Sequence, residues 1–330
     1  MNAKKFLSAV VLALAVAVTG CNKSGKLNTP STFTPPTNSA MELKIKWAPN
    51  ERMVEEFDMD QKMAINVPGR KPMDQDMSLG QKFSMTVLNT DADGGHEVEM
   101  EFMSAHMAME MGRTKMSYDS DKDSASGSTN PMAIIFNKMI GCKLQYFLDA
   151  SNNVQRIEGI DELTGRLAAG GGAAAQFKSM FTEDYFKQMM GANRLLPPNP
   201  VQPGDNWETQ IQVPAGFAML NIDYSLTFAR WEKHGERNCA RIEYSGTMQS
   251  QPGGNPGTMG MTMSVPEGST TGVFWFDPEF GTAIDSKANQ EMTMVITVPT
   301  RKKQVASGGS TLTMTNQLSQ VIAFKVDSLN

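Results

Sequence analysis

The chain has 330 residues, of which 30 are basic and 35 are acidic, and its formal net charge is −5. It carries no basic patch interleaved with aromatic residues, so nucleic acid is not an expected partner. Its length is enough to bury a large core, in one large domain or in two.

Residues 1–20 predict a signal peptide. Lys4 and Lys5 form a short positive region before the apolar run FLSAVVLALAVAV, which is too short to span a bilayer. The segment ends in VTGC, and this ending resembles a bacterial lipobox. We therefore expect Cys21 to be lipidated and to become the first residue of the mature chain, anchored in a membrane by its acyl chains. The alternatives are an ordinary signal peptide followed by a chance cysteine, or a buried N-terminal helix.

The expected location is the bacterial cell envelope. Asn22, next to the lipidated cysteine, favours the outer membrane, with the protein facing the periplasm. Removing Lys4 and Lys5 with the signal peptide leaves 28 basic against 35 acidic residues. No remaining apolar run has transmembrane length.

Residues 21–40 predict a lipidated, disordered tether. The sequence NKSGKLNTPSTFTPPTNSA is rich in Ser, Thr, Pro and Asn, with a single aromatic residue. A flexible chain of that length reaches roughly 25 Å on average. We expect it to hold a β-rich domain, residues 41–330, just off the membrane.

Apolar and polar residues alternate from residue 41 onward, which is typical of antiparallel strands with one buried face. The apolar positions of the first half include Met41, Leu43, Ile45, Trp47, Phe57, Met59, Met63, Ile65, Met77, Leu79, Phe83, Met85, Val98, Met100 and Phe102, with Gln61 as an interruption. NTDADGGHE supplies a turn between two of these strands. A short helix is expected over 131–140, and CKLQYFLDASNNVQRIEG predicts a hairpin.

Residues 159–197 predict a helical insert. Thr182 is a good N-cap, and Glu183 and Asp184 follow it in the first turn, where the helix dipole favours acidic side chains. Pro197 and Pro198 end the segment. Alternation then returns to the end of the chain. The expected fold class is therefore α+β and mainly antiparallel β: one or more curled sheets with a helical insert.

Two segments suggest an internal duplication. FSMTVLNTDADGGHEVEMEF (83–102) aligns with YSLTFARWEKHGERNCARIEY (224–244) with one insertion, and hairpin-like sequences follow both. Related half-repeats, 41–158 and 201–330, would then flank the helices. The alternative is that any two amphipathic hairpins look alike.

The order of segments resembles an uncharacterised family of bacterial envelope lipoproteins, a domain of unknown function. The resemblance rests on the lipobox at Cys21, on NPMAIIFNKMIGCKLQYFLDASNNVQRIEGIDEL (130–163), and on FTEDYFKQMMGANRLLPPNPVQPGDNWE (181–208). These are turn and helix signatures, and the family provides no catalytic residues to carry over. A curled sheet closed by helices is also loosely similar to the periplasmic lipoprotein carrier fold, which holds acyl chains.

Known catalytic motifs are missing from the sequence. It has no G-x-S-x-G elbow, H-E-x-x-H, EF-hand loop or phosphate loop. His96 and His234 fall in expected turns, where solvated side chains are ordinary. We therefore expect no enzyme and no cofactor, with an uncharacterised hydrolase as an alternative.

Methionine is the compositional outlier, with 27 residues against 16 Phe and 4 Trp. Met107, Met109 and Met111 lie at strand spacing in FMSAHMAMEM (102–111), and Met259, Met261 and Met263 repeat the spacing. Thioethers suit Cu(I), and His106 is a neighbour, although its parity points it to the other face. The apolar parity switches between Phe102 and Met107, which predicts a bulge or bend near Ser104–His106.

The bias extends along the whole chain, so we expect methionine mainly as adaptable core or cavity lining, with a methionine oxidation sink as a further alternative. Cys142 and Cys239 could form a disulfide, or stay as two buried thiols. The predicted function is non-catalytic binding of an apolar ligand or of an envelope partner. The alternatives are an interaction module with a filled core and a Cu(I)-binding periplasmic protein.

Overall fold

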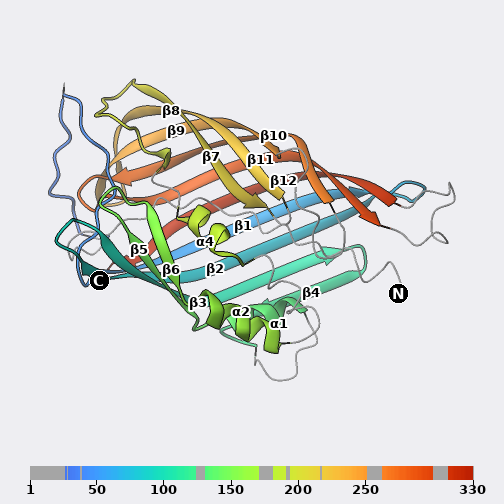
Figure 1. Cartoon of the computed structure of the whole chain (residues 1–330). Coiled ribbons are helices and arrows are strands. Elements are labelled where there is room, and N and C mark those ends of the chain that lie inside the picture. Colours follow the sequence, from blue (N-terminus) through green and yellow to red (C-terminus); the bar gives the residue numbers. More distant parts are fainter. Residues whose placement is uncertain are drawn as a thin grey trace.

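A computed structural model describes residues 27, 29–37, 39–123, 131–170, 181–190, 194–215, 218–250, 262–299 and 311–329. In these ranges twelve strands form one antiparallel sheet, with three helices beside it (Figure 1). The strands are β1 (Arg52–Asn66), β2 (Met73–Thr90), β3 (His96–Met111), β4 (Thr114–Asp119), β5 (Lys143–Leu148), β6 (Val154–Glu158), β7 (Asn206–Ala215), β8 (Ala218–His234), β9 (Arg237–Ser250), β10 (Thr262–Asp277), β11 (Thr282–Pro299) and β12 (Thr311–Leu329). The helices are α1 (Pro131–Met139), α2 (Ile160–Ala169) and α4 (Glu183–Met189).

The sheet curls but does not close into a barrel. Its strand order is β6-β5-β3-β2-β1-β12-β11-β10-β9-β8-β7, so β6 and β7 are its two edges. β3 is shared along its length: its first residues pair with β5 and its last residues pair with β4. The predicted fold, a curled and mainly antiparallel sheet with a small helical insert, is confirmed.

Alternating side chains give the sheet one buried face. In β1, residues 53, 55, 57, 59, 61, 63 and 65 are all buried, whereas residues 56, 58, 60, 62, 64 and 66 on the opposite face are partly or fully exposed. The register carries this parity to the neighbouring strands: Met63 lies opposite Leu318 on β12, and Leu318 lies opposite Met292 on β11. We call this buried face the inner face and the opposite one the outer face.

The helical insert lies where the sheet is open. α4 packs against both edge strands, β6 and β7, and α1 packs against α2 and β4. The Tyr185 amide donates to Thr182 Oγ1 over 3.1 Å, so the predicted N-cap of α4 is confirmed. α2 follows Gly159, whose φ of 91° explains glycine there. Residues 171–180 of the predicted helical insert, which include most of AAAQFKSMF, fall outside the described residues.

The two segments compared in the duplication hypothesis occupy similar hairpins. Both β2–β3 and β8–β9 contain a register shift near the turn, at Val87/Asn89 and at Phe228/Arg230. In each half two further strands extend the hairpin in the sheet, as β5–β6 and as β10–β11, although β4 and α1 intervene in the first half. This arrangement is consistent with half-repeats, which remain a prediction.

The alternating segment 41–47 does not join the sheet, contrary to the strand expected there. Leu43, Ile45 and Trp47 are buried as the alternation predicts, but among these residues only Met41 makes a β-bridge, to Val201. The segment runs across one end of the sheet: Lys46 bonds to the β10–β11 turn, and Trp47 Nε1 donates to Asn152 Oδ1 in the β5–β6 turn over 2.6 Å. An extended segment can thus bury one face without a paired strand.

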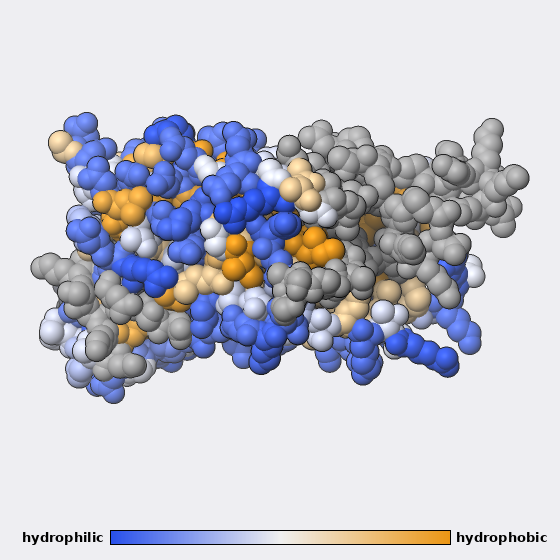
Figure 2. Space-filling view, turned by 90° about the horizontal axis from the view of Figure 1, so that it is seen from below, coloured by the Kyte–Doolittle hydropathy of each residue, from blue (hydrophilic) through white to orange (hydrophobic). Residues whose placement is uncertain are grey.

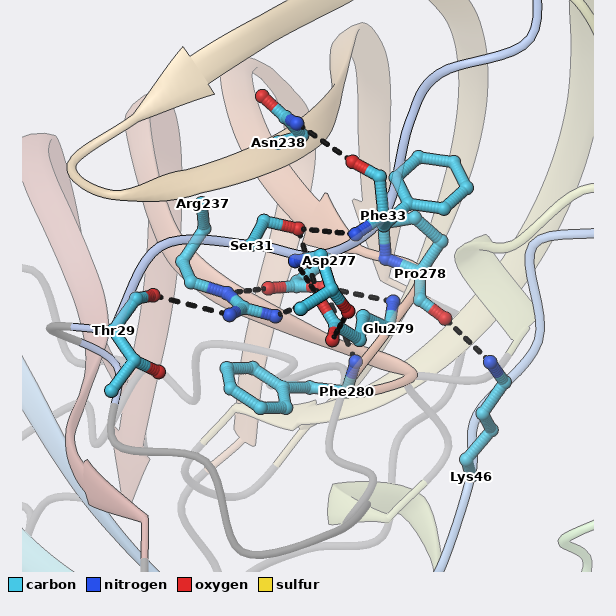
Figure 3. A network of polar contacts seen from close by, with 11 residues as sticks. Thr29, Ser31, Phe33, Lys46, Arg237, Asn238, Asp277, Pro278, Glu279 and Phe280 are labelled. Carbon is cyan, nitrogen blue, oxygen red and sulfur yellow. Dashed lines mark hydrogen bonds and ion pairs between the residues drawn. The ribbon is translucent and has the colours of Figure 1, made fainter.

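Residues 29–33 dock at the same end, although they fall within the predicted disordered tether (Figure 3). The Arg237 guanidinium donates to Thr29 O, Asn238 donates to Phe33 O, and the Phe33 ring packs on Trp231. We call this end of the sheet the docked end, and the opposite end, where residues 67–72 join β1 to β2, the far end.

Arg237 is the centre of the docked end. Its side chain is 2% exposed, and it forms 2.6 Å ion pairs with Asp277, which is fully buried, and with Glu279. The guanidinium also lies 3.9 Å from the centre of the Phe280 ring. Burial alone would raise the pKa of Glu279, but hydrogen bonds from Thr32 and Ser31 and the charge of Arg237 lower it to about 2. One buried cation therefore ties the N-terminal segment to two turns of the sheet.

Replacing Arg237 with methionine should lower the free energy of unfolding by about 3–5 kcal/mol, because the Asp277 carboxylate would stay buried without its counterion. The matched control is Arg166→Met, which removes an exposed i,i+4 pair with Glu162 and should cost about 0.3–0.5 kcal/mol. Urea denaturation of the two variants measures the difference. Equal effects would show that the docked end does not depend on this cation.

Candidate functional site

The inner face is lined by methionine along most of the sheet. Its buried methionines are Met53, Met59, Met63, Met77, Met85, Met100, Met107, Met109, Met248, Met263, Met292, Met294 and Met314. Buried leucine, isoleucine, valine and phenylalanine side chains share the inner face with these methionines. Unbranched, polarisable side chains adapt to ligands of different shape, so this face is the candidate functional site.

The outer surface differs sharply from this lining. Seen from below, the described surface is mostly hydrophilic, with apolar residues in separate patches (Figure 2). Among the described residues, the most exposed large hydrophobic side chains are Leu88, at 40%, and Val321, at 36%. The apolar character of the sheet is therefore concentrated inward.

The segment FMSAHMAMEM lies in β3 and contains the predicted irregularity. The register with β2 shifts between Phe102 and Ser104, so Met103 is an extra residue, next to the predicted position of the bulge. Beyond the bulge, Met107 and Met109 are buried on the inner face and Met111 is partly buried. Met109 lies opposite Met77 on β2 and Met116 on β4.

His106 faces the other way. Its side chain is 52% exposed on the outer face, covers Gly80 of β2, and has Nε2 3.7 Å from Asp58 Oδ1. A Cβ at position 80 would overlap the imidazole, so glycine makes room for it. The structure does not bring His106 together with Met107 and Met109. Met259 and Met261 lie outside the described residues, as does Cys21.

Cys142 and Cys239 are both buried free thiols, so the disulfide considered from the sequence is not present. Cys142 ends the α1 region, with Sγ 3.2 Å from Lys138 O, and Cys239 lies in β9. In the sheet, β3, β2, β1, β12, β11 and β10 separate β5 from β9. Burial raises the pKa of both thiols, which makes them unreactive.

The other two histidines have structural partners on the sheet. His96 Nδ1 lies 3.0 Å from Thr90 Oγ1, and burial lowers the pKa of its imidazole. His234 stacks on Trp275 and contacts Asp285 over 2.8 Å. Within the described part of the chain, no group of three His, Cys, Asp or Glu side chains could hold a metal ion.

Several inner-face positions are polar and lack partners. Both carboxylate oxygens of Glu51 and Glu55, both amide atoms of Gln61, and Oε1 of Gln320 are buried without a hydrogen bond. Glu55 and Gln61 occupy apolar positions of the β1 alternation, so the sequence does signal them, but it gives no sign that their partners would be missing. A filled apolar core would not tolerate many such groups.

Burial raises the pKa of both carboxyl groups. That of Glu51 rises from 4.5 to about 7, and that of Glu55 rises well above its ordinary value. Neither carboxyl has a cation in hydrogen-bond contact. The low-polarity surroundings near the docked end therefore favour the protonated, uncharged form of both carboxyl groups.

A groove of about 830 Å³ crosses the outer face of β1, β2, β10, β11 and β12. The side chains with outer-face parity that line it are Lys62, Ala64, Asp74, Asp76, Glu267, Ser269, Glu291, Thr293, Gln317 and Ser319. These side chains are mostly polar, and four of the five charged ones are acidic, unlike those of the inner face. The groove is therefore not the apolar site.

A sequence profile of DUF6263, a family of unknown function, matches residues 93–282, more than half of the chain. The chain belongs to this family. The match runs from the β2–β3 turn to the start of β11 and includes all three helices. The resemblance to an uncharacterised family is thereby confirmed; the lipoprotein character remains a prediction. No curated protein sequence matches this DUF6263 member.

Solved structures offer only distant similarities. Lipovitellin, in a structure of its lipid–protein interactions, matches with a TM-score of 0.41 at 6% identity; the match covers 86% of this chain and 26% of that chain. A putative outer membrane lipoprotein-sorting protein domain from Vibrio parahaemolyticus has a TM-score of 0.13 at 9% identity; the match covers 83% of this chain and 84% of that chain. A DUF1329 protein from Desulfovibrio piger has a TM-score of 0.13 at 8% identity; the match covers 82% of this chain and 85% of that chain. These TM-scores do not establish a shared fold.

No described helix is both long and apolar enough to cross a bilayer.

Met107→Ala should lower the free energy of unfolding by about 2–5 kcal/mol, because it empties a buried position on the inner face. His106→Ala, one residue away on the exposed face, should cost less than about 1 kcal/mol. Chemical denaturation of both variants measures the contrast. The reverse order would show that the histidine, and not the methionine, is structural.

The unfolding free energy should fall as pH rises from about 4.5 to 7. In that window the folded chain keeps protons on Glu51 and Glu55 that the unfolded chain has lost, so each group contributes a slope of up to about 1.4 kcal/mol per pH unit. Below pH 4.5 both states hold the protons of Glu51 and Glu55, so the contribution of these two groups ends. Glu51→Gln should flatten the profile, whereas exposed Glu291→Gln should leave it unchanged. Denaturation midpoints between pH 4 and 8 check this, and an unflattened Glu51→Gln profile would contradict it.

Proposed function

We propose that this protein is a non-catalytic, lipid-anchored protein of the bacterial cell envelope that binds an apolar ligand, such as an acyl chain, on the inner face of its curled sheet. The observation that carries the proposal is the inner face itself. It joins an adaptable methionine lining to buried polar groups that have no partner in the protein. A ligand with polar groups would supply the missing hydrogen bonds, and the methionine side chains could adapt to its apolar part.

The open edges of the sheet support a binding role. β6 and β7 are bridged by α4, a helix of seven residues, and are not hydrogen-bonded to each other. A short helix between two edges can move with less loss of hydrogen bonding than a closed barrel would require. Access to the inner face is therefore compatible with this architecture.

The lipid anchor is inferred from the lipobox sequence at Cys21. The docked residues indicate which end of the sheet such an anchor would hold near the membrane. Residues 22–28 separate Cys21 from docked Thr29, and seven residues span at most about 25 Å. A lipid on Cys21 would thus hold the docked end near the membrane surface. The far end, beyond Met63 and Met109, would point away from the membrane.

Non-catalytic action is supported by the placement of the titratable groups. His106 and His234 lie on the outer face beside single carboxylates, and the buried carboxyls Glu51 and Glu55 have no histidine bonded to them. Neither arrangement supplies a nucleophile activated by a base.

Protein extracted from membranes should carry a lipid in native mass spectrometry and should bind N-phenyl-1-naphthylamine, an uncharged fluorescent probe, saturably. Met292→Gln places an amide on the inner face and should weaken probe binding about fivefold or more, or about 1 kcal/mol. Glu291→Gln introduces the same side chain on the outer face and should leave binding unchanged. No saturable binding, or equal weakening by both variants, would contradict the proposal.

A further inference from the structure

Four polar side chains form a continuous row across the inner face. Gln61 on β1 lies directly opposite Gln320 on β12, Gln320 lies opposite Gln290 on β11, and Gln290 lies opposite Thr270 on β10. Neighbouring strands are about 4.8 Å apart, so the row spans about 14 Å. We call these four residues the amide row.

The row is largely unbonded, and all of its side chains except the partly exposed Gln290 are buried. Gln61 and Gln320 are each 2% exposed, and Thr270 is 1% exposed. One hydrogen bond lies within the row, from Gln320 Nε2 to Gln290 Oε1 over 2.6 Å. Both amide atoms of Gln61, Oε1 of Gln320 and Oγ1 of Thr270 have no partner. Buried donors and acceptors of this kind are normally satisfied.

Apolar rows lie on both sides of it. Toward the docked end, Met59 lies opposite Ile322, and Ile322 lies opposite Ala288. Toward the far end, Met63 and Met292 flank Leu318. A molecule lying along the strands would therefore meet an apolar surface, then hydrogen-bonding groups, then a second apolar surface.

The chemistry of the row selects the kind of polar group. Amides and a hydroxyl both donate and accept hydrogen bonds and carry no charge. An ionised carboxylate or phosphate would enter this buried row without a counterion, which is strongly unfavourable. An ester, an amide or a hydroxyl group would be satisfied without that cost.

We propose that the amide row binds the uncharged ester or hydroxyl groups of an acylated lipid, whose hydrocarbon chains lie on the flanking apolar rows. The inference rests on the proposed apolar-ligand function and narrows its ligand to neutral, ester-linked lipids. It predicts a preference for diacylglycerol over a plain hydrocarbon and over an ionised fatty acid.

The test measures displacement of N-phenyl-1-naphthylamine from full-length protein by 1,2-dioctanoylglycerol, by dodecane and by oleate. The wild-type protein should prefer the diacylglycerol. Gln61→Leu combined with Gln320→Leu should weaken displacement by diacylglycerol about tenfold and leave displacement by dodecane unchanged. Gln317→Leu, on the outer face of β12, is the matched control and should alter neither.

The outcomes separate this inference from the function on which it rests. No saturable probe binding would remove the apolar-ligand function. Probe binding with an unchanged diacylglycerol preference in the double variant would overturn only the amide-row inference and would leave water as the occupant of the row. If the double variant does not fold, the diacylglycerol preference of the single variant Gln61→Leu is measured instead, and an unchanged preference overturns the inference in the same way. In addition, diacylglycerol should raise the thermal midpoint of the wild-type protein more than that of Gln61→Leu, and equal increases would count against the inference.

Discussion

A twelve-stranded sheet with one apolar face must cover that face, and this requirement governs the rest of the molecule. The alternation in β1 continues through β12, β11 and β10, so the apolar surface is continuous over many strands. Three short helices pack at the edges of the sheet and on β4, and the described residues supply no second layer over its full width. Curling brings the sheet's own strands over the inner face and partly solves the problem.

The apolar inner face is covered differently at the two ends of the sheet. At the docked end the chain covers the face with residues 41–47 and fixes the turns through Arg237, a buried cation with two carboxylates and an aromatic ring. A buried ion pair adds little net stability over an apolar substitute, but it specifies which segments meet. Here it joins a segment near residue 30 to turns near residues 236 and 279. The far end has no such network among the described residues and carries much of the methionine.

Much of the fold can be predicted from local sequence because a strand's period is a local property. The alternation gives the strands, the parity switch after Phe102 gives the bulge at Met103, and Thr182 gives the cap of α4. The same reasoning fails at 41–47, where the alternation is real but the sheet provides no partner strand. It also fails at residues 29–33, because their composition is that of a tether and their binding site is built from residues two hundred positions away.

The candidate site shows the same division between local and long-range information. Parity alone places Met107 inward and His106 outward, and so separates the methionines from the histidine. The amide row depends on register: Gln61, Gln320, Gln290 and Thr270 each interrupt the alternation of a separate strand, and only the pairing of those strands aligns them. A single misplaced glutamine in a strand is a tolerable irregularity. Four aligned across adjacent strands, with apolar rows on both sides, amount to a feature of the whole sheet. For that reason the proposal of a ligand rests on the whole row and not on any one of its side chains.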